Sequence, residues 1–168
     1  MASLHEGILP LERENALHEK ICPWAATFPQ YACAHNGIDG MLAAASFFAP
    51  AFLEIDGCVF VQMFIWNNPF ADADAFAQQL ASQFHGDRRA MERWVNAWSV
   101  AELFADGAAR LDDLPDLPEK ILDFARCIAH FWEQRLRAQF PARTFIFEIG
   151  EEIEGESGIS ITFYQKEQ

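Results

Sequence analysis

The order of apolar and polar positions predicts a β-hairpin over residues 51–66. Two apolar runs, 51–55 and 58–66, flank the pair Asp56-Gly57. An Asp-Gly pair between apolar runs is typical of the tight turn that joins antiparallel strands. Apolar side chains fall on both faces of the second strand, so both faces must be covered. We therefore expect this strand to be central in its sheet, with Gln62 as a hydrogen-bonded core amide.

A second hairpin is predicted over residues 143–164. Apolar positions alternate on either side of a loop rich in Gly and Glu, which indicates one buried face. That face carries Phe145, Phe147, Ile149, Ile159, Ile161 and Phe163. The opposite face is half polar and carries Thr144, Ile146, Glu148, Ser160, Thr162 and Tyr164. A homodimer that forms through this half-polar face is one possible assembly.

Helical spacing of apolar residues predicts helices before and between the hairpins. The expected helices cover residues 9–22, 40–49, 69–85, 88–98 and 118–140, whereas 24–36 is irregular and 106–118 is a connecting loop. In the fourth of these helices, Met91, Trp94, Val95 and Trp98 form the expected buried stripe. The fold class is therefore α+β: a single domain over residues 1–168, with a mostly antiparallel sheet from two hairpins and four to six helices.

The charge balance limits the kinds of partner. The chain has 168 residues and a formal net charge of -13. Phosphate backbones and anionic lipids are bound by clustered Lys and Arg, so nucleic acid and membrane surfaces are excluded as expected partners. No segment has the pattern of a secretory signal or a transmembrane helix, and four cysteines are too few for a disulfide scaffold. We expect a cytoplasmic protein with free thiols.

Two helical pairs resemble fragments of a zinc site. His18 and Cys22 are four residues apart, and Cys127 and His130 are three apart. On the last helix, however, His130 projects opposite the apolar stripe and should face water. Structural zinc sites usually place their ligand pairs on loops or turns. We therefore predict no metal site and no other cofactor.

The loop of the second hairpin is strongly acidic. Glu151, Glu152, Glu154 and Glu156 lie within six residues of each other. The ordered spacing of a calcium-binding loop is absent. Several carboxylates held together attract the Lys and Arg side chains of a partner. This loop is the predicted binding site for a basic partner protein.

A different kind of site is conceivable in the irregular segment. Trp24, Tyr31, Cys33 and His35 could line a small-molecule or enzymatic pocket, because irregular chain often carries function. Cys33 and His35 are two residues apart and would point the same way on extended chain. No oxyanion hole or lowered thiol pKa can be argued for them from the sequence.

The predicted function is that of a small acidic interaction protein in the cytoplasm. It binds a basic partner protein, as a toxin-neutralising immunity protein or an adaptor would. The alternative is a ligand-binding or enzymatic pocket near Cys33 and His35, so catalytic activity stays open. No glycine-rich phosphate loop or nucleophile elbow is present in the sequence.

Overall fold

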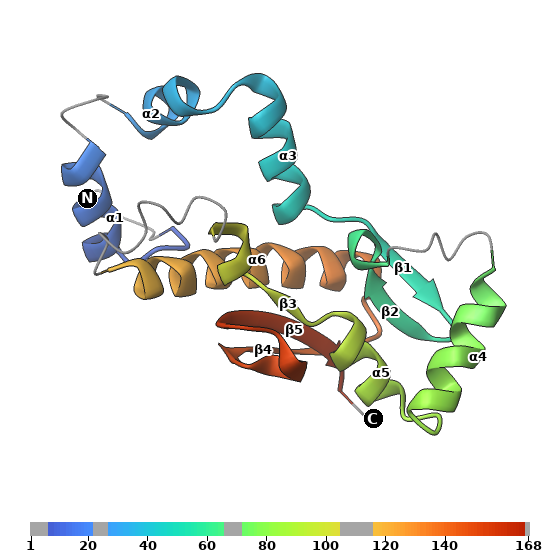
Figure 1. Ribbon diagram of the computed structural model, residues 1–168. Helices are drawn as coiled ribbons and strands as arrows, with labels where there is room; N and C mark the ends of the chain where they lie inside the picture. Colours follow the sequence, from blue (N-terminus) through green and yellow to red (C-terminus); the bar gives the residue numbers. More distant parts are fainter. Residues whose placement is uncertain (1–6, 22–26, 66–71, 105–115, 167–168) are drawn as a thin grey trace. The chain divides into compact units, whose positions relative to one another are not determined.

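A computed structural model describes residues 7–21, 27–65, 72–104 and 116–166 (Figure 1). The chain divides into two compact units, Met1–Phe48 and Ala49–Gln168, and each is described by itself. The single domain over residues 1–168 stays a prediction. None of the described helices is both long enough and apolar enough to cross a membrane.

The first unit is helical. It contains α1 (Leu11–Ile21), α2 (Phe28–His35) and α3 (Ile38–Phe48). The helices expected over 9–22 and 40–49 are thus confirmed, but most of the segment expected to be irregular is α2. Thr27 begins this helix, because its side-chain oxygen accepts a hydrogen bond from the Gln30 N–H at 3.3 Å and a proline follows in the first turn.

In the described residues, the second unit combines two small antiparallel sheets with three α-helices. It contains β1 (Phe52–Ile55), β2 (Cys58–Val61), α4 (Ala73–Gln83), α5 (Arg88–Val95), β3 (Trp98–Ser99), α6 (Leu117–Gln139), β4 (Phe145–Glu151) and β5 (Ile159–Gln165). The 3-10 turn η1 (Gln62–Phe64) follows β2, and the 3-10 turn η3 (Ile153–Gly155) follows β4. One sheet is β1-β2 and the other has the order β3-β5-β4. The α+β class and both predicted hairpins are confirmed.

The first hairpin turns at the predicted Asp-Gly pair. Asp56 and Gly57 have φ angles of 48° and 79°, the positive values of the tight turn that matches strand twist. All four residues of β2 are buried, as expected. The expected long central strand is wrong, however, because β2 ends at Val61 and pairs only with β1 in the described chain. The exposed Gln62 begins η1 instead of serving as a core amide.

The second hairpin is covered on both faces, so the prediction of one buried face is wrong. On one face α6 packs against the sheet, with the ring centres of Trp132 and Phe163 6.1 Å apart. On the other face α5 packs against β5, where the Thr162 hydroxyl donates to the Arg93 carbonyl at 2.7 Å. Tyr164 is only 3% exposed. The half-polar face is therefore not free to join two copies of the chain.

The core of this unit is organised around Phe163 of β5. Its ring contacts Phe52, Phe145 and Phe147 at centre-to-centre distances of 5.8, 5.8 and 5.4 Å. Trp132 completes the cluster and is fully buried. Aromatic rings at these separations add packing energy beyond the area that they bury. The abundance of Phe in the sequence thus reflects a ring cluster that joins both sheets to α6.

Candidate functional site

The most unusual polar groups of the second unit lie on α5. Glu92 and Asn96 are four residues apart, so they share one face of the helix, and both are 0% exposed. Trp94, predicted to be buried, is 45% exposed and packs against Phe84 with ring centres 5.7 Å apart. The buried side of α5 is therefore partly polar, which the apolar pattern of the sequence did not predict.

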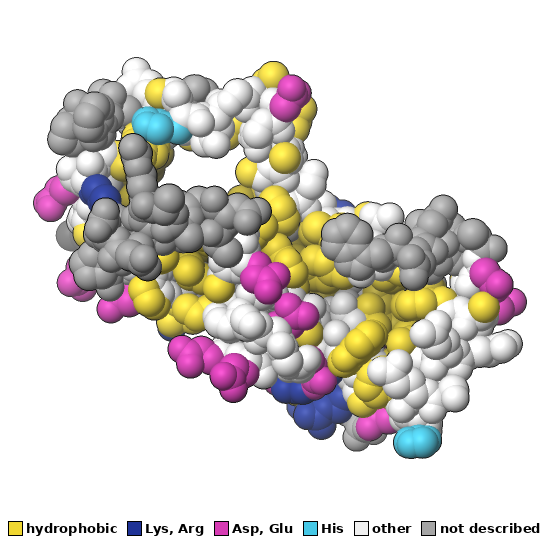
Figure 2. Space-filling model, viewed as in Figure 1, with side chains coloured by type: hydrophobic (Ala, Val, Ile, Leu, Met, Phe, Trp, Pro, Cys, Tyr) yellow, Lys and Arg dark blue, Asp and Glu magenta, His cyan; other side chains and the backbone are white. Residues whose placement is uncertain are grey.

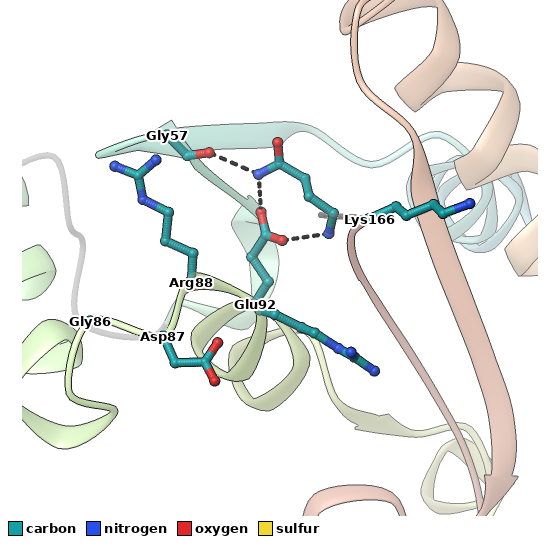
Figure 3. A pocket seen from close by; sticks show the side chains of 8 residues that line it. Gly57, Gly86, Asp87, Arg88, Glu92 and Lys166 are labelled. Atoms are coloured by element: carbon teal, nitrogen blue, oxygen red, sulfur yellow. Dashed lines mark hydrogen bonds between the residues drawn. The ribbon is translucent and has the colours of Figure 1, made fainter. Parts of the chain in front are cut away.

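Glu92 joins β2 to β5 (Figure 3). One carboxylate oxygen accepts the Val59 N–H at 2.7 Å, and the other accepts the Gln165 N–H at 2.6 Å. The Gln165 side-chain amide adds a third donor at 2.5 Å. Burial raises the pKa of Glu92, while these donors from Gln165 and Val59 act in the opposite direction. Its carboxylate supplies acceptors to two strands that do not pair with each other.

Asn96 makes the equivalent connection one helical turn further on. Its side-chain oxygen accepts the Val61 N–H at 2.9 Å. Its amide nitrogen donates to the Val59 and Phe163 carbonyls at 2.9 and 3.2 Å. We call Glu92 and Asn96 together the α5 bridge. It satisfies backbone groups along β2 and β5 that would otherwise be buried without partners.

A cavity of about 380 Å³ lies beside the α5 bridge. It is lined by Gly57, Gly86, Asp87, Arg88, Arg89, Glu92, Gln165 and Lys166. In Figure 3 the Arg88 side chain extends beside Gly57, whereas the Lys166 side chain points away from both. Asp87 caps α5 by accepting the Ala90 N–H at 2.9 Å, as its place in the sequence predicts. Arg88 and Lys166 therefore do not converge on one point at the start of α5, and the Asp87 carboxylate already lies there.

The thiols of Cys58 and Cys127 are not activated. Cys58 is buried, and this burial raises its pKa to about 11, with the nearby Glu92 adding to the effect. Burial also raises the pKa of Cys127. The thiolate is the nucleophilic form, so both side chains stay protonated and unreactive near neutral pH.

A second polar cluster connects α5 to the last hairpin. Two guanidinium nitrogens of Arg93 donate to one carboxylate oxygen of Glu148, at 3.1 and 2.9 Å. The Tyr164 hydroxyl donates to the other oxygen of Glu148 at 2.7 Å. Arg89 donates to the Tyr164 oxygen at 3.1 Å and lies over the tyrosine ring. The remaining nitrogen of Arg93 pairs with Glu154 in the acidic loop.

Glu148 gives this cluster a defined pH dependence. The hydrogen bonds from Arg93 lower its pKa, and the Tyr164 hydroxyl acts in the same direction. The stabilisation from a lowered pKa is present above the unfolded-state value, about 4.3, and is lost as pH falls through the folded-state value.

We expect the stability advantage of wild type over Glu148→Gln, measured by urea unfolding, to shrink as pH falls below about 4. An advantage unchanged from pH 7 to pH 3 would contradict this assignment.

The structure separates the four predicted acidic residues by their surroundings. Glu151 and Glu152 are exposed, and their side chains make no hydrogen bond or ion pair within the described part of the chain. Glu154 is neutralised by Arg93. Glu156 is half-buried. Figure 2 shows acidic side chains beside the β4–β5 hairpin and basic side chains close to α5.

The acidic loop has a fixed shape. Ile153 is 7% exposed and anchors it in the core. The Ser99 hydroxyl donates to the Ser157 carbonyl at 2.6 Å, which ties the loop to β3. Glu152 and Glu154 have φ angles of 57° and 54°, a region that is uncommon for residues other than glycine. Backbone held in this conformation occurs often at binding and active sites.

The alternative pocket residues lie in the first unit. Trp24 falls outside the described residues, and Cys33 and His35 both belong to α2. Because this segment is helical, the argument from extended chain no longer holds. The rings of Tyr31 and His35 stack with centres 4.1 Å apart, and a His35 ring nitrogen lies 2.8 Å from the Tyr31 carbonyl oxygen. The His35 ring therefore contacts Tyr31 of the same helix through both stacking and its ring nitrogen.

The metal ligands considered from the sequence do not form a site in the described residues. Within those ranges, no group of three His, Cys, Asp or Glu side chains is placed to hold a metal ion. His130 is exposed, as its helical position predicts, and Cys22 lies outside the described residues.

Comparison with family models, curated proteins and solved structures gave no match to this chain.

The residues that connect the elements of this site were not predicted from the sequence. They are Arg89, Glu92, Arg93, Asn96 and Tyr164. The spacing of Glu92 and Asn96 was visible, but ordinary exposed helices also carry polar residues four apart. Only the position of α5 against two open strand edges gives these residues their partners.

Proposed function

We propose that this protein is a binding module that docks a basic partner protein through the acidic loop of the β4–β5 hairpin. The observation that carries the proposal is the pair of exposed carboxylates, Glu151 and Glu152, on a loop of fixed shape. A preorganised loop binds with less loss of conformational entropy than a mobile one. The acidic net charge adds attraction to a basic protein over longer distances.

Neighbouring groups leave these two carboxylates available. Arg93, which pairs with Glu154 of the loop, also pairs with Glu148. The loop therefore has its internal charge compensated at Glu154 and presents uncompensated charge at Glu151 and Glu152. Lysine and arginine side chains of a partner are the complementary groups. This is the chemistry expected of an immunity-like or adaptor protein that recognises a cationic surface.

Removing both carboxylates tests the proposal. We expect Glu151→Gln/Glu152→Gln to lose a basic partner that wild type captures from a cell extract. With that partner purified, the dissociation constant should rise about tenfold, because each exposed ion pair contributes roughly 0.2–1 kcal/mol. For wild type, the same constant should rise when NaCl is increased from about 50 to about 500 mM, as screening requires.

A matched variant separates local recognition from net charge. Glu12→Gln/Glu19→Gln removes two exposed carboxylates from α1 and changes the net charge equally. It should bind as wild type does. Equal binding by the loop variant, or binding that is insensitive to salt, would refute the proposed site.

A further inference from the structure

The outer edge of β4 carries backbone groups without partners. The Lys166 N–H donates to the Thr144 carbonyl at 2.8 Å, which extends the β4–β5 ladder. The backbone N–H and C=O groups of even-numbered residues of β4 therefore point towards β5. Odd-numbered residues therefore direct their N–H and C=O groups away from β5. These residues are Phe145, Phe147, Ile149 and Glu151, and no hydrogen bond to their outward groups occurs among the described residues.

The free edges of β2 and β5 in this unit are protected. The edges of β2 and of the end of β5 receive hydrogen bonds from the α5 bridge, and the start of β5 pairs with β3. By contrast β4 is seven residues long, contains no proline or lysine, and has partly exposed Phe and Ile side chains. Such an edge is a template for pairing with another strand.

We propose that two copies of this chain pair through β4, antiparallel and centred on Phe147. Phe147 then lies opposite Phe147 of the second copy, and Phe145 lies opposite Ile149 of the second copy. Each of these opposed pairs exchanges both backbone hydrogen bonds, because all these residues direct their N–H and C=O groups outward. The two three-stranded sheets become one continuous sheet.

Charge complementarity selects this register. Centring on Phe147 places Glu151 opposite Arg143 of the second copy, on the same face of the sheet. Within the dimer Glu151 is therefore compensated by this cation, and Glu152 is the carboxylate of the loop that keeps its uncompensated charge. Centring on Glu148 instead places two carboxylates directly opposite each other, and such like-charged pairs destabilise a sheet. Centring on Ile149 leaves Glu151 opposite Phe147. Arg143 already donates to Glu54 at 2.5 Å and to the Gly57 carbonyl at 3.5 Å, and its guanidinium lies over the Phe140 ring. A guanidinium carries five N–H donors, so others are left for a second carboxylate.

Cross-linking tests the register. Directly opposed, mutually hydrogen-bonded residues have Cα atoms about 5.5 Å apart, within the range of a disulfide. We expect Phe147→Cys to form a covalent dimer under mild oxidation that reductant reverses. Phe145→Cys is the matched control, because it lies opposite Ile149 and should cross-link no more than wild type. Equal cross-linking in the two variants, or none in Phe147→Cys, would overturn the proposed register.

Sedimentation equilibrium tests the assembly without oxidation. When the protein concentration is varied over about a hundredfold range, the dimer fraction of wild type should rise with concentration. Ile149→Pro should weaken the dimer at least about tenfold, because it removes an outward N–H from each copy. The inward ladder to β5 does not use that N–H, and proline is tolerated at such edge positions. Ile149→Val keeps the N–H and should match wild type. A monomeric wild type, or an unaffected Ile149→Pro dimer, would refute the proposal.

Discussion

Replacing Glu92 by alanine is expected to lower the free energy of unfolding by about 3–5 kcal/mol, because each buried group left without its hydrogen-bond partner costs about 1–3 kcal/mol. The substitution leaves the Val59 N–H, the Gln165 N–H and the Gln165 side-chain amide without their acceptor. Since Glu92 is fully buried, water does not replace it at low cost.

Urea unfolding of three variants measures this contribution. Glu92→Gln keeps the shape but turns an amide NH₂ towards a backbone donor, so a loss of about 1–3 kcal/mol is expected. Glu133→Ala removes a glutamate that is partly exposed on α6 and should change stability by less than about 0.5 kcal/mol. A stability of Glu92→Ala within about 1 kcal/mol of wild type would show that the bridge contributes little.

Asn96→Ala is expected to lower the free energy of unfolding by about 2–4 kcal/mol. It leaves the Val61 N–H and the Val59 and Phe163 carbonyls without the amide that pairs with them. Circular dichroism during urea unfolding measures the loss. A loss no greater than that of an exposed helix substitution would contradict the role assigned to this amide.

Asn96→Asp provides a sharper test of the same site. At neutral pH the second carboxylate oxygen would face two carbonyl oxygens, so this variant should be less stable than Asn96→Ala. The environment would raise the folded-state pKa of the new carboxyl above the unfolded value of about 3.9. Protonation restores a donor, so stability relative to wild type should recover as pH falls through that raised pKa. A deficit that does not change with pH would exclude this geometry.

The α5 bridge and the proposed binding loop belong to one arrangement. Glu92 and Asn96 position α5 across β2 and β5, and Arg93 between them contacts Glu148 and Glu154. The helix thereby holds the acidic loop as well as the two sheets. Variants of the bridge should therefore be assessed for folding before their partner binding is interpreted.

Local sequence signals predicted the parts of the fold that depend on local chemistry. Asp56-Gly57 determined the first hairpin, because few other pairs accept positive φ at both turn positions. Asp87 began α5 by capping its first turn. Alternation predicted β4 and β5, and helical spacing predicted α6 nearly to its ends. The cluster of glutamates was visible without any structure.

Tertiary packing decided what these elements do. The sequence could not show that β2 stops at Val61 or that Glu92 is buried, since both depend on α5 lying against open strand edges. Neither could it show that Glu154 is neutralised by Arg93 while Glu152 is exposed. The sequence by itself determined both hairpins, most of the helices and the overall charge, because those follow from neighbouring residues and composition. Only the tertiary structure decided which polar groups hold the sheets together and which strand edge and carboxylates are left for a partner, because those depend on residues far apart in the chain.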